Sequence, residues 1–528
     1  METPRLPRIG DYLDHFAEVQ SDTVLVKQGP TAVTYREGRE RVDRLAAALL
    51  AHGLRHGDRV AVYGHPDSDA LLVFLACARV GAIFTGLAPK QQVDELAYIC
   101  TQAEPRFLFV VGAIVAEQLE KIAALGSRLD REGKIGTVET IHCGADAPPG
   151  CLSLEQFEAE ATDPEQLAAA AAAVEALDPA AVVFTSGSSG APKAALLVHG
   201  PMMRSYSVQA EHWYGRRPVG VADLPINHLG FVADNCMTLM VAGGTINVLE
   251  RWTPEGVLEL LEAERFTFWW TQTTMLLLAT RSPRWARTDF GSLERIAFGG
   301  APVNPSMLEA LAATGASLSS GYGMTEVHGN ITYTDNDAPA EALLHTVGRP
   351  HHEFEVRIVD EEGEPCPAGT VGEIVARTDT LFGGYRDRAG AVDPGRDEEG
   401  WYHTKDTAFE REDGNFVLVG RKDHMFKSGG FNVYPREVER VLESHPDVSI
   451  AVVVDVPDPT WARVGHAYVV PEPDRDLAAE DLDQFARERL ANYKVPKRLH
   501  LREELPMLIS GKVDSRALQR ESEALVEG

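Results

Sequence analysis

Short runs of β-branched and aromatic residues alternate with stretches rich in Ala, Leu and Glu through most of this 528-residue chain. The clearest runs are RVAVYG at 59–64, RFLFVVG at 106–112, AAVVFTSG at 180–187 and TINVLE at 245–250. Two neighbouring parallel strands must be joined by a long crossover connection, which is usually a helix. Strands that alternate with helices along the sequence are therefore typical of a parallel sheet. The alternation therefore predicts an α/β protein whose sheets are covered by helices on both faces.

Two alanine-rich stretches are predicted to be helices of different kinds. ALLVFLACA at 70–78 is apolar throughout and stops at Arg79, which suits a buried helix. PEQLAAAAAAVEALD at 164–178 combines strong helix formers with flanking Glu and Leu, which suits a surface helix leading into the next strand.

The sequence pattern changes after residue 380. From there, residues typical of turns and charged residues replace the alternation of strand-like and helix-like stretches. NFVLVG at 415–420 predicts a strand, and VYPREVERVLESH at 433–445 then begins a helix of a new unit. We predict a large N-terminal domain at 1–420 and a small, mobile α+β C-terminal domain at 421–528. A short charged hinge would let the small domain rotate, since interfaces within a chain are usually moderate in size.

Acidic residues outnumber basic ones, with 79 Asp and Glu against 50 Lys and Arg and a net charge of −29. Such a surface repels a polyphosphate backbone, which argues against nucleic acid as the main partner. No stretch approaches the roughly 18 apolar residues of a membrane span, and the amino end lacks the apolar core of a signal peptide. The six cysteines form no CxxC pair, which predicts neither a disulfide framework nor a zinc site and favours a cytoplasmic setting.

The most informative stretch is AVVFTSGSSGAPKAALLVH at 181–199, a glycine- and serine-rich loop between two apolar runs. Backbone amides exposed by glycine, hydroxyl donors and a lysine are the groups that hold nucleotide phosphates. A Walker loop requires its lysine between Gly and Ser or Thr, whereas Pro192 and Ala194 flank Lys193. The spacing therefore predicts phosphate binding and excludes an ordinary kinase or GTPase loop.

The loop TSGSSGAPK at 185–193 resembles the phosphate-loop signature of the adenylate-forming superfamily, which includes acyl- and aryl-CoA ligases, stand-alone adenylation enzymes and luciferases. Further motifs follow in the family's order: GYGMTE at 321–326, YHTKD at 402–406, GRKD at 420–423, KSGG at 427–430 and SGKVD at 510–514. The resemblance implies the two-domain adenylate-forming fold and a reaction in which ATP and Mg²⁺ convert a carboxylic acid to an acyl-adenylate.

The resemblance also assigns residues to ATP. The β- and γ-phosphates would lie against the loop residues Thr185, Ser186, Gly187, Ser188, Ser189, Gly190 and Lys193. Gly300 and Ala301 resemble the loop beside adenine, on which Tyr322 would stack. Thr325 would hydrogen-bond the α-phosphate, and Glu326 would bind Mg²⁺, which prefers oxygen ligands.

Asp406 would accept both ribose hydroxyls, because a carboxylate offers lone pairs to two donors. Arg421 would contact the ribose or the phosphates. The chain departs from the family pattern just before Asp406, where the family usually has glycine and this chain has Lys405. Ala194 is a second departure, since glycine commonly follows the loop lysine. The first departure raises the question of the backbone geometry beside Asp406.

Residues of the C-terminal unit are assigned by the same resemblance. Lys512 matches the lysine that bridges the attacking carboxylate and the α-phosphate during adenylation. The small domain would then rotate about Asp423, withdrawing Lys512. Lys427, Gly429 and Gly430 would come to the site instead, where glycine lets a pantetheine arm pass close to the backbone.

The acid pocket of the family follows a Pro-x-x-His element, here PINH at 225–228, in which His228 resembles the residue near the acid carboxylate. Modular α-amino-acid domains usually carry Asp where this chain has Gly230, whereas Asp234 follows one helical turn later. A buried Asp234 would need a partner such as a substrate ammonium; otherwise it faces solvent or caps a helix. Gly321 and Asn330 are assigned to the same pocket. These and the other predicted wall residues are small or polar (Gln272, Thr273, Thr274 and Gly329), which suits a modest, partly polar acid.

Three fates of the adenylate stay open. KSGGFNVYP at 427–435 looks more like acyl-CoA ligases, which favours an acid–thiol ligase that transfers the acyl group to CoA and releases AMP and pyrophosphate. A stand-alone enzyme could instead load a β-amino or aminoaryl acid onto the phosphopantetheine of an acyl carrier protein in natural-product biosynthesis. Other relatives spend the adenylate on an amine or activate nitrite. The sequence identifies neither the acid substrate nor the oligomeric state.

Overall fold

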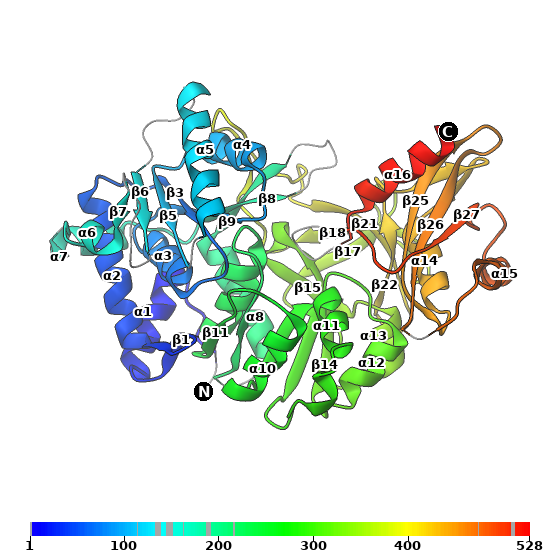
Figure 1. Cartoon of the computed structure of the whole chain (residues 1–528), viewed down its shortest axis with the longest axis horizontal. Helices are drawn as coiled ribbons and strands as arrows, with labels where there is room; N and C mark the ends of the chain where they lie inside the picture. The colour runs from blue at the N-terminus through cyan, green and yellow to red at the C-terminus, as the bar shows by residue number, and fades with distance from the viewer. Residues whose placement is uncertain are drawn as a thin grey trace.

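The computed structural model describes residues 3–112, 115–132, 139–143, 151–161, 163–185, 192–214, 217–473, 475–507 and 513–527. Five sheets organise these residues, and the last of them lies apart from the others on the right of Figure 1, together with helices α14 to α16. Among the described residues, no helix is both long and apolar enough to cross a membrane.

The largest sheet has nine strands in the order β20–β19–β9–β8–β4–β3–β5–β6–β7. The strands are β3 (Arg59–Tyr63), β4 (Ile83–Leu87), β5 (Phe107–Val110), β6 (Glu139–His142), β7 (Leu152–Ser153), β8 (Pro179–Thr185), β9 (Lys193–Val198), β19 (Gly384–Arg386) and β20 (Val392–Asp393). Neighbours from β8 to β7 are parallel, which confirms the prediction from the helix–strand alternation. Strands β9, β19 and β20 add an antiparallel edge.

Helices of the N-terminal region surround this sheet (Figure 1). They are α1 (Ile9–Val19), α2 (Tyr35–Ala51), α3 (Ser68–Arg79), α4 (Val93–Ala103), α5 (Ala116–Glu132), α6 (Leu154–Glu158) and α7 (Pro164–Ala172). All residues at 70–78 in α3 are buried, as predicted. Helix α7 buries none of its residues, and it begins with an Asp163 cap and Pro164 at the first position, so the predicted surface helix is also confirmed.

A second sheet has the order β10–β11–β1–β2, and the predicted strand TINVLE contributes β11 to it. Its strands are β1 (Val24–Gln28), β2 (Thr31–Thr34), β10 (Val219–Ala222) and β11 (Thr245–Val248). The nearby helices are α8 (His199–Trp213), the π-helix η1 (Gly230–Met237) and α9 (Thr238–Met240). Helix α8 packs against η1, which brings the PINH element close to α8.

A third sheet has the order β12–β13–β14–β15–β16. Its strands are β12 (Phe268–Gln272), β13 (Arg295–Gly299), β14 (Ser317–Met324), β15 (Gly329–Tyr333) and β16 (Arg349–Pro350). The helices beside it are α10 (Pro254–Glu264), α11 (Thr273–Thr280), α12 (Pro305–Ala312) and α13 (Ala340–His345), with the 3-10 turns η2 (Trp285–Arg287) and η3 (Thr325–Val327). Parallel strands β12, β13 and β14 align Gln272, Gly299 and Gly321 at their carboxyl ends, the edge at which open α/β sheets bind ligands.

The remaining two sheets are built mainly from antiparallel strands. One contains β17 (Glu355–Val359), β18 (Gly372–Arg377), β21 (Tyr402–Glu410) and β22 (Phe416–Arg421). The other contains β23 (Phe426–Ser428), β24 (Phe431–Val433), β25 (Val448–Asp458), β26 (Ala462–Pro471) and β27 (Arg498–Leu501), with helices α14 (Pro435–Glu443), α15 (Ala479–Arg489) and α16 (Ser515–Glu527). The predicted strand at 415–420 matches β22 and the predicted helix at 433–445 contains α14. The division into 1–420 and 421–528 falls at the end of β22 and stays a prediction.

Candidate active site

A tight loop follows β13 at the shared carboxyl edge of the third sheet. The hydroxyl of Thr273 donates hydrogen bonds to the carbonyls of Gly299 (3.2 Å) and Ala301 (2.7 Å). Between them, Gly300 has a φ of +84°, which favours glycine. A Cβ atom on Gly299 would lie 2.9 Å from the carbonyl oxygen of Gly321, so position 299 leaves no room for a side chain. The shape suits the predicted adenine loop.

Three predicted ATP residues meet around one carboxylate. The Tyr322 hydroxyl donates to Oδ2 of Asp406 at 2.6 Å, and Nη1 of Arg421 lies 3.2 Å from Oδ1. The antiparallel pairing of β21 and β22 places Asp406 opposite Arg421. Burial and the Asp406 carboxylate raise the pKa of Tyr322 well above its ordinary value, so the phenol stays protonated and donates.

The departure at Lys405 has a local explanation. Lys405 has a φ of +64°, the left-handed region that glycine adopts most easily. Its N–H donates to Oε1 of Glu373 (3.0 Å), and its carbonyl accepts from the N–H of Lys422 (2.7 Å). These two bonds hold the strained residue and keep the backbone aligned for Asp406. The glycine of the family pattern and the lysine of this chain thus fit the same conformation.

Replacing this lysine with glycine (Lys405→Gly) should stabilise the protein. A non-glycine residue in the left-handed region costs about 1–2 kcal/mol, part of which the greater backbone entropy of unfolded glycine offsets. We expect a gain of roughly 0.5–1 kcal/mol in the free energy of unfolding, measured as a higher denaturant midpoint at unchanged slope. Lys90, an exposed lysine outside the positive-φ set, provides the control Lys90→Gly, which should destabilise. A loss of stability in Lys405→Gly would contradict the strain argument.

A second cluster joins Glu326 and Lys193 through a tyrosine. The Tyr385 hydroxyl donates to Oε1 of Glu326 at 2.7 Å, and Nζ of Lys193 lies 4.7 Å from the centre of the Tyr385 ring. Thr325 stands beside Glu326 at the start of η3, and the β8–β9 pairing sets Thr185 opposite Lys193. The remaining predicted loop residues, Ser186 to Gly190, lie outside the described residues.

Two residues of this region, Tyr385 and His328, were not predicted from the sequence. Buried His328 accepts a hydrogen bond from the Val198 N–H at Nε2 (3.0 Å), and its Nδ1 lies 2.7 Å from the Thr380 carbonyl. Burial lowers the pKa of His328 to about 4, so the neutral ring ties the turn that carries Glu326 to β9. The sequence feature that could have pointed to Tyr385 is the GGY tripeptide at 383–385, which lies in a stretch predicted to consist of turns.

The helix after PINH is a π-helix, which corrects the α-helical spacing predicted for Gly230 and Asp234. Asp234 is buried, and its Oδ1 accepts a 2.7 Å hydrogen bond from the hydroxyl of Tyr206 on α8. The alternative that Asp234 faces solvent is therefore wrong. Nδ1 of His228 accepts from the N–H of Gly230 at 2.9 Å, which orients the imidazole at the start of η1.

Asn330 and Gly321 lie beside a glutamine that the sequence analysis also missed. Nδ2 of Asn330 donates to Oε1 of buried Gln209 at 3.2 Å, and a Cβ atom on Gly321 would lie 3.0 Å from Cγ of Asn330. Gln209 and Tyr206 stand on α8, where buried polar side chains interrupt an otherwise apolar environment. The sequence feature that could have pointed to them is the polar run SYSVQ at 205–209.

The predicted hinge and thiol residues lie at the start of the C-terminal unit. Asp423 accepts a hydrogen bond from Nε of Arg421 at 3.2 Å. Lys427 is exposed on β23, and the Gly429 N–H donates to the Trp461 carbonyl at 2.9 Å. Gly430 follows in a left-handed conformation with no atom where a Cβ would stand. Lys512 lies outside the described residues.

A polar contact joins the C-terminal sheet to the ends of helices α11 and α12 beside the third sheet. The Glu472 carboxylate accepts from Arg281 (3.0 Å), Asn304 (3.2 Å) and Ser306 (2.8 Å). Asn304 also donates to the Ser449 carbonyl at 3.1 Å, and Arg281 donates to the Ser449 hydroxyl. Any rotation of the C-terminal unit must break these bonds.

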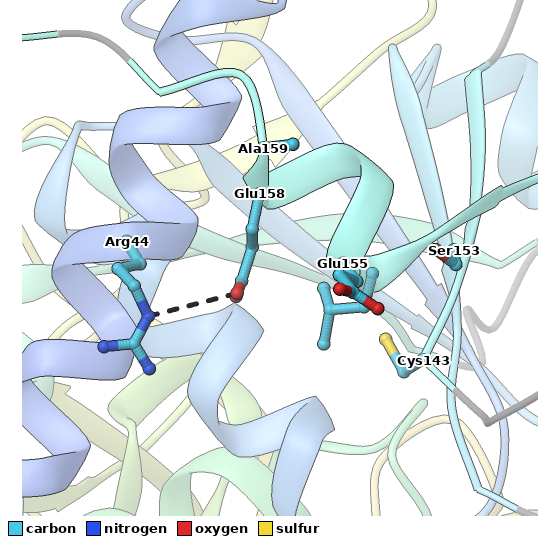
Figure 2. A pocket seen from close by; sticks show the side chains of 7 residues that line it. Arg44, Cys143, Ser153, Glu155, Glu158 and Ala159 are labelled. Atoms are coloured by element: carbon cyan, nitrogen blue, oxygen red, sulfur yellow. Dashed lines mark ion pairs between the residues drawn. The ribbon is translucent and has the colours of Figure 1, made fainter.

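Two features elsewhere do not belong to this site. A surface hollow of 580 Å³ lies between α2 and α6, with the Arg44–Glu158 ion pair on its wall and Cys143 at one side (Figure 2). His351, His352 and Glu353 form the sole His/Cys/Asp/Glu group of metal-binding spacing in the described part of the chain. The Glu353 carboxylate is already paired with Arg5 and Arg204, which makes it a poor metal ligand.

Comparisons with known proteins agree with this arrangement. The family model described as AMP-binding enzyme matches residues 13–386, and the AMP-binding enzyme C-terminal domain matches residues 437–512. The first match covers well over half of the chain. The protein is therefore an adenylate-forming ligase: it belongs to the AMP-binding enzyme family.

Named relatives resemble the chain over nearly its whole length. It is 33% identical over 506 residues to a feruloyl-CoA synthase of Amycolatopsis sp, covering 96% of this chain and 97% of that one. It is 28% identical over 513 residues to an indoleacetate–CoA ligase of Aromatoleum aromaticum, covering 96% of both. The structure of the amide bond synthetase McbA from Marinactinospora thermotolerans matches with a TM-score of 0.82 and 28% identity, covering 97% of this chain and 99% of that one.

Proposed function

We propose that this enzyme uses ATP and Mg²⁺ to activate a small aryl acid that carries a hydrogen-bond donor, and then transfers the acyl group to CoA. The observation that carries the first half is the convergence of Tyr322, Asp406 and Arg421 in one cluster and of Glu326 and Lys193 in another. The chemistry requires cations and donors where negative charge concentrates on the phosphates, because a carboxylate must approach ATP.

Each cluster has a task in this proposal. Asp406 would hold the ribose, while Lys193 and Thr325 would hold the phosphates. Glu326 fits the Mg²⁺ ligand, since it is a nearly buried carboxylate whose partner is a neutral phenol. Bound Mg²⁺ would neutralise phosphate charge. Lys512 would neutralise the attacking carboxylate together with the α-phosphate.

The second half requires the C-terminal unit to move. Asp423 would be the hinge, and the loop with Lys427, Gly429 and Gly430 would line the path of the pantetheine thiol. The rotation would exchange the Glu472 contacts for others, which is plausible energetically because partly exposed hydrogen bonds have water as an alternative partner. The naming of relatives as CoA ligases supports CoA as the acceptor.

The nature of the acid is proposed from Asp234. A carboxylate buried in the helix after PINH is costly unless it has hydrogen-bond donors, and the Tyr206 hydroxyl supplies one to Oδ1. An amino or phenolic group of the substrate would supply another. The polar neighbours Gln209 and Asn330 suit the same partly polar acid better than a long alkyl chain.

The change Asp234→Asn tests this assignment. Acid-dependent pyrophosphate–ATP exchange would be measured for matched pairs of aryl acids with and without an amino or hydroxyl group. Losing a hydrogen bond to a buried charge should lower kcat/KM for the donor-bearing acids roughly 10- to 100-fold and leave the plain acids within about threefold. Asp67→Asn, which removes a buried carboxylate at the cap of α3, is the matched control. An equal loss of kcat/KM with both classes of acid would mean that Asp234 has a purely structural role.

An amide-forming enzyme is the second candidate, because the amide bond synthetase structure matches at 28% identity. A carrier-protein acceptor is the third, since the fatty acid–[acyl-carrier-protein] ligase ScoC of Streptomyces coeruleorubidus is 27% identical over 536 residues. Supplying CoA, a phosphopantetheine-bearing carrier protein and an amine together, with the product identified by mass, separates the three. We expect the CoA thioester as the main product. An amide or an acylated carrier protein in its place would overturn the CoA assignment.

A further inference from the structure

Tyr385 contacts the two predicted charge-bearing residues of the phosphate end at once. Its hydroxyl donates to Oε1 of Glu326 (2.7 Å), and its ring face receives the ammonium of Lys193 (4.7 Å to the centroid). No ion pair joins Lys193 to Glu326 within the part of the chain that the structure describes, where Tyr385 links the two side chains.

The ring is held firmly enough to act as a spacer. Strand β19 pairs with β9, which places Tyr385 opposite Ala195, two residues after Lys193. The ring packs edge-on against Phe382 at 4.7 Å, and its oxygen lies 3.3 Å from the hydroxyl of Tyr402. The N–H of Phe382 also donates to the carbonyl of Glu326 at 2.9 Å, so both backbone and side chain of Glu326 are tied to this segment.

The chemistry explains why a tyrosine suits this place. A direct Lys–Glu ion pair would neutralise both groups and leave each less able to attract a metal ion or a phosphate. A phenol fixes the carboxylate by a hydrogen bond and fixes the ammonium by its ring face, and it adds no charge of its own. Both side chains therefore keep their full charge for ligands.

We propose that Tyr385 is a positioning residue that holds Glu326 for the metal ion and Lys193 for the phosphates while keeping the two apart. This inference rests on the proposed roles of Glu326 and Lys193. It makes separate predictions for the hydroxyl and for the ring, because the hydroxyl contacts the Glu326 carboxylate and the ring face contacts the Lys193 ammonium.

Two variants separate these contacts. Tyr385→Phe removes the hydroxyl and keeps the ring, whereas Tyr385→Leu removes both. Mn²⁺, which prefers the same oxygen ligands as Mg²⁺, would be titrated by electron paramagnetic resonance into enzyme saturated with a non-hydrolysable ATP analogue. The Kd of ATP in the presence of EDTA would be measured by calorimetry as the readout of the Lys193 side.

In Tyr385→Phe we expect the Mn²⁺ Kd to rise roughly tenfold, while the metal-free ATP Kd stays within about twofold. In Tyr385→Leu both values should rise. Adding Tyr385→Phe to Glu326→Gln should cause no further loss of Mn²⁺ affinity, because the hydroxyl then has no carboxylate to hold. Tyr35→Phe removes a buried hydroxyl that donates to the Gly244 carbonyl far from this cluster, and it should change neither Kd.

An unchanged Mn²⁺ Kd in Tyr385→Phe, together with a weakened one in Glu326→Gln, would overturn the positioning role and leave the proposed function intact. An unchanged metal-free ATP Kd in Tyr385→Leu would overturn the proposal that the Tyr385 ring positions Lys193 for the phosphates. An unchanged Mn²⁺ Kd in Glu326→Gln would overturn the proposed metal role and this inference with it.

Discussion

Replacing Lys512 with alanine is expected to abolish adenylate formation and to spare thioester formation from a supplied acyl-adenylate. Adenylation brings the acid carboxylate against the α-phosphate, and the lysine of the SGKVD motif would be the cation between them. Removing one group that stabilises transition-state charge typically costs about 10²–10³ in rate. Pyrophosphate–ATP exchange reports the first half-reaction, and release of AMP from purified acyl-adenylate plus CoA reports the second.

The control for this experiment is Arg520→Ala, which removes an exposed cation from α16 of the same unit. It should leave both half-reactions close to those of the unmodified enzyme. Parallel loss of both half-reactions in Lys512→Ala, with folding intact by circular dichroism, would refute the division of labour between Lys512 and the loop at 427–430.

Replacing Asp406 with alanine is expected to raise the KM for ATP by roughly 10²–10⁴, because two hydrogen bonds to a charged group are lost at about 1.5–3 kcal/mol each. The same change leaves the Tyr322 hydroxyl without its acceptor and Arg421 without one of its carboxylates. The measurement compares KM for ATP with KM for 2′-deoxy- and 3′-deoxy-ATP.

The unmodified enzyme should discriminate against both deoxy nucleotides, and Asp406→Ala should treat all three alike. Asp406→Asn, which keeps one acceptor oxygen and loses the charge, should give an intermediate KM. Discrimination that survives in Asp406→Ala would place ribose recognition on other residues.

Several strands could be predicted from the sequence, because their formation depends mainly on the residue types within each short segment. The strands at 59–64, 106–112 and 245–250 correspond to β3, β5 and β11, because β-branched runs between turns fold as strands wherever they pair. The antiparallel edge formed by β19 and β20 was not predicted. The β9 partner of β19 is distant in the chain, and strands of two or three residues gain their stability only from the pairing itself.

The candidate site divides in the same way. The order of the motifs, through their resemblance to the adenylate-forming superfamily, was enough to indicate the class of chemistry and to assign Lys193, Glu326 and Asp406, because the proposed contacts to phosphates, metal and ribose each call for a specific residue type within a short motif. The neutral side chains that hold predicted site residues became visible only in the fold, where Tyr385 contacts Glu326, Tyr206 contacts Asp234 and Gln209 contacts Asn330. Tyr385, Tyr206 and Gln209 come from elements far away in the chain, and a hydrogen bond between distant elements leaves no pattern in the sequence around either partner.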